Sequence, residues 1–175
     1  RTMLRRLETF ARVDGRRLMD IYREDNIENT DYFYPDMKDK AQALARVEQD
    51  FLHYLETDFF SKPGKACWVL EENGVWVSAL RLSEIAPGDY YLEALETHPD
   101  FRRRRCAVRL LEAVLAELRA QGPFRLRDCV GKKNVPSLGV HEKCGFRIAA
   151  QDGTDYLSGE VNERCYGMEY VWKGE

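Results

Sequence analysis

Apolar and polar residues along the chain alternate with two different periods. From residue 38 to 57 and from Arg104 to Ala120, apolar residues recur every three or four positions, which predicts two amphipathic helices. The second helix ends at Gln121-Gly122-Pro123, because glycine and proline stop helical structure. Shorter helices are predicted at 14–24 and at 135–144, and the stretch from 26 to 36 between the first two helices reads as a loop.

Runs rich in β-branched and aromatic residues predict the strands. The clearest pair is Ala66 to Glu72 and Val75 to Glu84, because the dipeptide Asn73-Gly74 between them favours the positive φ angles of a tight hairpin. Tyr90 to Thr97 is a further strand, which Pro99 stops. The other predicted strands are Thr2 to Leu7, Phe124 to Val130, Arg147 to Ala150 and Cys165 to Trp172.

The order of these elements predicts a mixed α/β fold, in which helices cover a central twisted sheet. The 175 residues contain no repeat, no low-complexity stretch and no long linker, so one domain over 1–175 is expected.

Composition narrows the class of protein. The 27 basic and 30 acidic residues give a net charge of -3. This charge argues against general electrostatic binding of nucleic acid and suits a cationic small molecule as ligand. No apolar run approaches the ~20 residues of a membrane-spanning helix, and no leader is evident, so we expect a cytoplasmic protein with no membrane partner. The five cysteines are odd in number and widely spaced, which indicates reduced thiols and no metal site.

The first stretch that carries chemistry runs from Thr97 to Ala107, where a strand ends and a helix begins. Such a turn directs free backbone N–H groups and the positive end of the helix dipole at a ligand, which favours an anion. Four arginines in this turn, at 102 to 105, add donors that suit phosphate, so a pyrophosphate-bearing ligand is predicted. The alternative is a solvated run of charge.

The second stretch runs from Asn134 to Phe146, on the short helix that follows the next strand. Asn134 can cap this helix, and His141, two turns later, carries a proton that it can transfer near neutral pH. A lone histidine on a helix also occurs as a packing or surface residue.

The two stretches together resemble the GNAT superfamily of acyl-CoA N-acyltransferases. The first is similar to its cofactor motif, Pro-x-Tyr/Phe-Arg-x-x-Gly-x-Gly/Ala, through four matching residues, and the second to its Asn-x₆-Tyr-Glu-Lys-x-Gly-Phe motif through five. The matching residues are Pro99, Phe101, Arg102 and Ala107 in the first motif and Asn134, Glu142, Lys143, Gly145 and Phe146 in the second.

The resemblance implies that acetyl-CoA binds in a cleft between two splayed strands of a mostly antiparallel sheet. It places a bulge in the strand from Tyr90 to Thr97, and the three-residue spacing of Leu92 and Leu95 is compatible with one inserted residue there. Backbone groups of this strand would hold the pantetheine arm and the acyl carbonyl. The implied cofactor-binding residues are Leu95, Glu96, Thr97, Arg102, Arg103, Arg104, Arg105, Cys106, Ala107, Asn134 and Ser137.

Two residues depart from the family pattern. Arg105 stands where the family has glycine, so its side chain either crowds the phosphate or contacts it. His141 stands where the family has the tyrosine that protonates the departing CoA thiolate, and we predict that His141 takes that role, with Tyr166 as a weaker substitute.

Attack on a thioester also requires an amine that has lost its proton, and therefore a base. Glu93 and Glu96 lie on the strand that leads to the cofactor turn, and Glu93 is preferred because it resembles a substrate-contacting glutamate of aminoglycoside-type members. Glu96 is the second candidate, and an exposed or ion-paired carboxylate is the alternative for both. Tyr32, Phe33 and Tyr34 are expected either to line the acceptor pocket or to pack as a lid.

The sequence thus predicts an N-acetyltransferase, a monomer or homodimer, that transfers acetyl from acetyl-CoA to a small cationic primary amine by direct attack in a ternary complex, without a metal. The alternatives are a catalytically weakened CoA-binding or sensor protein of the same fold and, third, a nucleic-acid binder that uses the arginine run.

Overall fold

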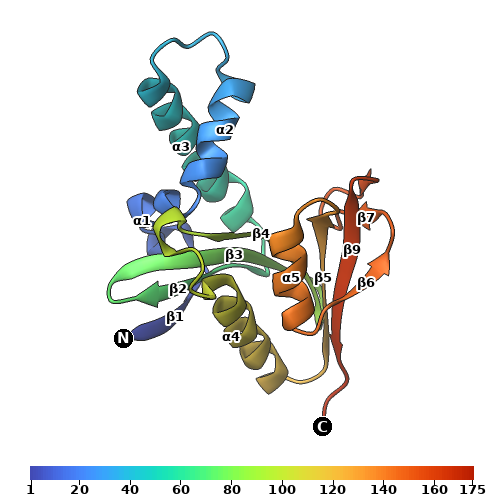
Figure 1. The fold of residues 1–175 in the computed structure, drawn as a ribbon. Coiled ribbons are helices and arrows are strands. Elements are labelled where there is room, and N and C mark those ends of the chain that lie inside the picture. The colour runs from blue at the N-terminus through green and yellow to red at the C-terminus, as the bar shows by residue number, and fades with distance from the viewer.

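A computed structural model describes residues 1–175, which form a seven-stranded sheet with helices on both faces (Figure 1). The strands are ordered β1-β2-β3-β4-β5-β9-β6; β4 and β5 run parallel, and every other neighbouring pair in this sheet is antiparallel. The predicted mixed, mostly antiparallel sheet is therefore confirmed.

The strands of this sheet are β1 (Thr2–Leu7), β2 (Lys65–Glu72), β3 (Val75–Ala86), β4 (Asp89–Thr97), β5 (Phe124–Gly131), β6 (Arg147–Ala150) and β9 (Cys165–Trp172). The helices are α1 (Gly15–Ile21), α2 (Arg23–Phe33), α3 (Lys40–Thr57), α4 (Cys106–Ala120) and α5 (Val135–Lys143). Short 3₁₀ turns lie at Phe10–Arg12, Phe59–Ser61 and Pro99–Phe101. None of the helices is both long and apolar enough to cross a membrane.

Two apolar cores lie on the two faces of the sheet. On one face α4 buries its stripe, including Leu111 and Val114, against Leu80 and Leu126 of the sheet. On the other face α1 and α3 pack residues such as Leu18 against Val69 and Ala79. Figure 1 shows α2 and α3 projecting side by side from this second face.

The predicted hairpin at Asn73-Gly74 is confirmed, since β2 and β3 pair as antiparallel neighbours and both turn residues have positive φ, 50° and 82°. Strand β5 was predicted without an assignment of its two faces. The structure buries Leu126 and Asp128 under the helices and directs Arg127 to the opposite face.

The predicted loop from 26 to 36 is wrong, because α2 runs from Arg23 to Phe33. Its two buried positions are polar, Asn26 and Thr30, so the helix has no apolar stripe to show in the sequence. The single helix predicted at 14–24 is also divided, since Tyr22 separates α1 from α2. The helix predicted from Arg104 begins at Cys106, because the preceding Arg105 is left-handed.

A small hairpin that was not expected, β7 (Gly153–Thr154) with β8 (Val161–Asn162), lies beside β5 and β9. The sequence from 153 to 162 contains no long β-rich run that would indicate it.

Candidate active site

The two central strands β4 and β5 separate after a short paired segment. They pair in parallel only at Asp89–Arg125, Tyr90–Leu126 and Tyr91–Arg127, although β4 continues to Thr97. The edge of β4 that faces β5 beyond Tyr91 therefore has backbone N–H and C=O groups without a strand partner. This open edge lies where the family resemblance implies a cleft between splayed strands.

The predicted bulge in β4 is confirmed. Ala79 pairs with Glu96, and Arg81 pairs with Glu93. An advance of two residues along β3 therefore corresponds to three residues along β4, which has one extra residue. Ala94, within the bulge, has a left-handed φ of 57°. The hydroxyl of Tyr22 donates a hydrogen bond to the Ala94 carbonyl at 2.7 Å, which ties the bulge to the segment between α1 and α2.

The arginine turn leads from the end of β4 into α4. Arg103 and Arg105 have φ values of 63° and 58°, in the left-handed region that ordinarily favours glycine. Arg105 is the N-cap of α4 and its side chain makes no capping hydrogen bond, so the first-turn N–H groups of α4 face outward without a side-chain partner. These residues fit a pyrophosphate group, since a turn of this shape concentrates N–H donors and positive charge.

The four arginines of this turn do not act alike. Arg102 forms an ion pair with Glu24 of α2, and the Arg104 guanidinium lies 5.0 Å from the centre of the Phe101 ring. The side chains of Arg103 and Arg105 form no ion pair. These two are therefore the arginines available to an anion.

His141 lies inside the core between α5 and β5, only 1% exposed. Its Nδ1 is 2.7 Å from the Ser137 carbonyl oxygen and 3.5 Å from the Ser137 hydroxyl, and its Nε2 hydrogen-bonds the buried carboxylate of Asp128. An acceptor at each ring nitrogen favours the doubly protonated imidazole, and the hydrogen bond and charge of Asp128 together outweigh burial and raise the pKa of His141. Its predicted role as proton donor to the thiolate stays a prediction, and these contacts support a structural role.

The two candidate bases differ in their surroundings. One carboxylate oxygen of Glu93 is 3.2 Å from a guanidinium nitrogen of Arg81. The guanidinium carbon of Arg81 in turn lies 5.4 to 5.8 Å from the ring centres of three aromatic residues, Phe51, Tyr54 and Phe59. Glu93 is therefore committed to a largely buried ion pair.

Glu96 has no basic ion-pair partner, and its carboxylate accepts the Thr97 N–H at 3.3 Å. Burial, and then the hydrogen bond and charge of Asp25, raise the pKa of Glu96 to about 7. The sequence contained nothing to indicate Asp25, which lies 71 positions before Glu96.

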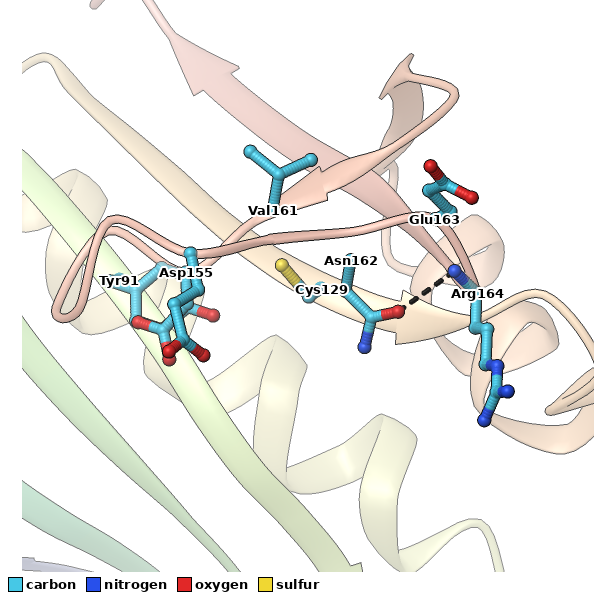
Figure 2. Close-up of a pocket in the computed structure, with 8 residues that line it drawn as sticks. Tyr91, Cys129, Asp155, Val161, Asn162, Glu163 and Arg164 are labelled. Atoms are coloured by element: carbon cyan, nitrogen blue, oxygen red, sulfur yellow. Dashed lines mark hydrogen bonds between the residues drawn. The ribbon is translucent and has the colours of Figure 1, made fainter.

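An acidic cavity of about 470 Å³ lies between the β7–β8 hairpin and the sheet (Figure 2). Tyr91, the last residue of β4 that pairs with β5, contributes to its wall, so the cavity borders the point at which the two strands separate. Its eight lining residues are Tyr91, Cys129, Asp155, Glu160, Val161, Asn162, Glu163 and Arg164.

Other predicted residues lie elsewhere. Tyr32 and Phe33 are exposed at the end of α2, and the Tyr34 hydroxyl hydrogen-bonds Asp50, so none of the three lines this cavity. Asn134 caps α5 by accepting the Ser137 N–H at 3.2 Å. Tyr166 lies on β9, with the Lys132 ammonium 5.2 Å from its ring centre. All five cysteines are free thiols.

Comparison with known proteins identifies one family. A model of the acetyltransferase (GNAT) family matches residues 16–146, and no curated protein sequence matches the chain. Among solved structures, PaiA N-acetyltransferase from Thermoplasma acidophilum in complex with coenzyme A is 15% identical with a TM-score of 0.63, over 98% of this chain and 99% of that one.

Two further solved structures share the fold. The ribosomal-protein-S18-alanine N-acetyltransferase from Escherichia coli is 17% identical with a TM-score of 0.65, over 100% of this chain and 96% of that one. A spermidine N-acetyltransferase chimera of SpeG from Vibrio cholerae and hSSAT is 16% identical with a TM-score of 0.64, over 97% of this chain and 94% of that one. At these identities the likeness concerns the fold alone.

The buried His141–Asp128 pair predicts an unusual dependence of stability on pH. Burial opposes the charge of the ring, but the hydrogen bond and charge of Asp128 outweigh it and hold the pKa of His141 above its ordinary value. This stabilisation is complete below the unfolded pKa of about 6.5 and is lost as the pH rises through the higher folded pKa. In Asp128→Asn only burial and the Ser137 carbonyl act on the ring, so its pKa should fall below 6.5 and stability should instead rise with pH.

Urea unfolding of the parent and of Asp128→Asn between about pH 6 and pH 9 measures how the free energy of unfolding changes with pH in each protein. At the acid end we expect Asp128→Asn to cost about 3 to 5 kcal/mol, the scale of breaking a buried ion pair. His53→Gln, which removes an exposed histidine of α3, is the control and should keep the parent's slope. Equal slopes for parent and Asp128→Asn would contradict the assignment.

The left-handed conformation of Arg105 predicts that Arg105→Gly stabilises the ligand-free protein. Glycine adopts this region without the steric cost of roughly 1 kcal/mol or more that a side chain incurs. Arg104→Gly is the matched control, since Arg104 has no positive φ and glycine there should be neutral or destabilising. Free energies of unfolding from urea titration compare them, and an equal loss in both variants would show that Arg105 is not strained.

Proposed function

Because the chain belongs to the GNAT acetyltransferase family, we propose that residues 1–175 form one N-acetyltransferase domain that transfers the acetyl group of acetyl-CoA to a small, cationic primary amine by direct attack in a ternary complex. The observation that carries this proposal is the open edge of β4 ending in the arginine turn at the N-terminus of α4. The edge offers backbone groups to the arm of acetyl-CoA, and the turn offers donors to its phosphates.

The cosubstrate would lie along this edge and turn. Backbone groups of Leu95, Glu96 and Thr97, beside the bulge, would hold the pantetheine arm and orient the thioester carbonyl. The turn from Arg102 to Ala107 would hold the pyrophosphate, with Arg103 and Arg105 as the guanidinium groups that form no ion pair within the protein. Asn134 and Ser137, in the first turn of α5, would contact the arm from the β5 side.

We assign the base to Glu96, with Glu93 as the second candidate. A base works best when its pKa lies near the working pH, and the pKa of Glu96 is raised to about 7, first by burial. Glu93 is paired with Arg81, so its carboxylate is already engaged by a positive charge.

The acidic cavity supports a cationic acceptor. Its wall carries the carboxylates of Asp155, Glu160 and Glu163 against one cation, Arg164, and it borders the end of β4–β5 pairing. A protonated amine is attracted to such a cavity, and it must then lose its proton before it can attack the thioester carbonyl carbon. The ammonium first gives one proton to Glu96, and the neutral amine then attacks the thioester carbon. The nitrogen loses its second proton to solvent as the carbon–sulfur bond breaks, and the thiolate takes a proton from a donor for which His141 and Tyr166 stay candidates.

A CoA-binding or sensor protein with weak catalysis is the second candidate function. It is favoured by Arg105 in a position shaped for glycine and by the fully bonded ring of His141. A cytoplasmic location and a monomeric or homodimeric state complete the proposal as predictions.

Binding of acetyl-CoA should raise the melting temperature, because a ligand that binds only the folded state stabilises it. The Arg105 guanidinium has no ion-pair partner within the protein, so we expect it to contact a phosphate of acetyl-CoA. Arg105→Gly should then weaken binding by about 1 to 3 kcal/mol. Calorimetry of both proteins measures this. Tighter binding by Arg105→Gly would show that the side chain crowds the phosphate, and the absence of any heat or thermal shift at millimolar acetyl-CoA would contradict the proposed function.

Glu96→Gln should lower kcat/KM for a cationic amine by roughly 10²-fold or more, the scale of a general-base contribution, while leaving the affinity for acetyl-CoA nearly unchanged. Glu93→Gln is the matched control on the same strand, and we expect it to raise KM more than it lowers kcat. The assay follows CoA release with a panel of mono- and diamines. Full activity of Glu96→Gln together with an inactive Glu93→Gln would transfer the base to Glu93, and CoA binding without turnover of any amine would favour the sensor.

A further inference from the structure

The bulge of β4 is held by hydroxyl groups from two other parts of the chain. The Tyr22 hydroxyl, from the segment between α1 and α2, donates to the Ala94 carbonyl at 2.7 Å. The Ser78 hydroxyl, from β3, donates to the Glu96 carbonyl, also at 2.7 Å. Both donor residues are buried, so water does not readily compete for these carbonyls. The carbonyl groups that precede and follow Leu95 are therefore both fixed by side chains.

The peptide group between Ala94 and Leu95 has no ladder partner in either neighbouring strand. The register with β3 passes from Glu93 to Glu96 and skips both residues, and pairing with β5 ends at Tyr91. The sheet therefore does not set the orientation of this peptide group. In addition, Ala94 has a φ of 57°, a conformation that a residue other than glycine keeps only where its surroundings hold it.

A contact that holds the Ala94 carbonyl also aims the Leu95 N–H. The peptide bond between the two residues is trans, so its C=O and N–H point in opposite directions in one plane. Tyr22 belongs to the core on the face of the sheet covered by α1 and α3, whereas Leu95 packs against the core under α4. The Leu95 N–H is thus directed away from Tyr22, toward the face on which the arginine turn leads into α4.

We propose that Tyr22 is a positioning residue for the reaction, which acts by turning the Leu95 N–H toward the carbonyl oxygen of the thioester. The inference rests on the proposed function, since it assumes that acetyl-CoA lies along the open edge of β4. Tyr22 itself does not contact the reacting atoms. Burial raises the pKa of its phenol, so the hydroxyl keeps its proton and stays a donor near neutral pH.

A fixed N–H at this place stabilises the charge that develops during attack. As the amine nitrogen bonds to the carbonyl carbon, an electron pair of the C=O bond moves to the oxygen, and the Leu95 N–H donates to the resulting anion. When the C=O bond forms again, the carbon–sulfur bond breaks and the thiolate leaves. A donor that is already aimed needs no reorganisation during this step, whereas a peptide group that rotates freely must first be ordered.

The first test is Tyr22→Phe, assayed with one accepted amine. The variant keeps the ring, whose centre lies 5.3 Å from that of Phe51, and removes only the hydroxyl. We expect kcat to fall about 10- to 100-fold, the scale of a misplaced catalytic group, while KM for the amine stays nearly unchanged.

Tyr170→Phe is the matched control for this variant. It removes the hydroxyl that accepts from Arg119 at 2.9 Å, on β9 and outside the bulge, and it should keep the parent's kcat. An unchanged kcat in Tyr22→Phe, or an equal fall in Tyr170→Phe, overturns the inference.

The second test is spectroscopic and needs no turnover. Acetyl-CoA labelled with ¹³C at the acetyl carbonyl is bound to each protein without an amine, and its C=O stretching band is recorded by infrared difference spectroscopy. A hydrogen bond from the Leu95 N–H lowers this frequency, so the band should lie lower in the parent and in Tyr170→Phe than in Tyr22→Phe. A purely structural role of Tyr22 would not move the band, so equal frequencies in the parent and Tyr22→Phe overturn the inference.

The third test uses the parent alone and remains decisive even if Tyr22→Phe folds poorly. The protein is labelled with ¹⁵N-leucine, and the Leu95 amide resonance is assigned from its loss in Leu95→Met. CoA and acetyl-CoA differ only in the acetyl group, so the Leu95 amide should shift further when the parent is saturated with acetyl-CoA. A parent that binds no acetyl-CoA would contradict the proposed function itself. Binding that leaves the Leu95 amide equal with both ligands overturns only the role of Tyr22.

Discussion

The separation of β4 from β5 is the constraint on which the rest of the site depends. A strand in the middle of a sheet ordinarily has both edges hydrogen-bonded, and an unpaired buried edge is costly. Here β4 loses its partner after Tyr91, and the sheet accommodates this with a bulge at Ala94 whose carbonyl is satisfied by Tyr22. The strand then ends in a turn whose N–H groups are also free. The early end of β4–β5 pairing thus leaves β4 with unpaired backbone groups in the same segment that leads to the uncapped start of α4.

Two ion pairs support the two faces of the sheet beside this opening. His141 and Asp128 join α5 to β5 under the α4 core, and Arg81 and Glu93 join β3 to β4 under the rings of α3. A buried ion pair adds little to the stability of a protein, because both charges lose their hydration. Loss or displacement of one partner, however, leaves an unpaired buried charge and strongly destabilises the protein. Each pair therefore helps to fix the position of the strand it holds.

The sequence predicted those parts of the structure that depend on local periodicity and turn chemistry. The apolar stripe of α4, the Asn73-Gly74 hairpin and the capping role of Asn134 all appear as expected. The bulge in β4 was implied by the family resemblance, and the spacing of Leu92 and Leu95 is compatible with it. By contrast, α2 was missed because its helix is held by polar buried residues and by contacts with α3, and these leave no periodic pattern.

The chemistry of single residues was harder to predict, because it depends on contacts between distant positions. The sequence placed Glu93 and Glu96 on the strand that leads to the arginine turn, and the resemblance placed His141 at the family's tyrosine position. Their environments, however, come from Arg81, Asp25 and Asp128, none of which belongs to a motif. The arginine turn shows the same limit. Glycine would form its left-handed positions without strain, whereas arginine at 103 and 105 costs roughly 1 to 2 kcal/mol at each position. Under the proposed function, the two unpaired guanidinium groups offset that strain only when an anion is bound, so the turn exchanges stability of the free protein for affinity toward phosphate.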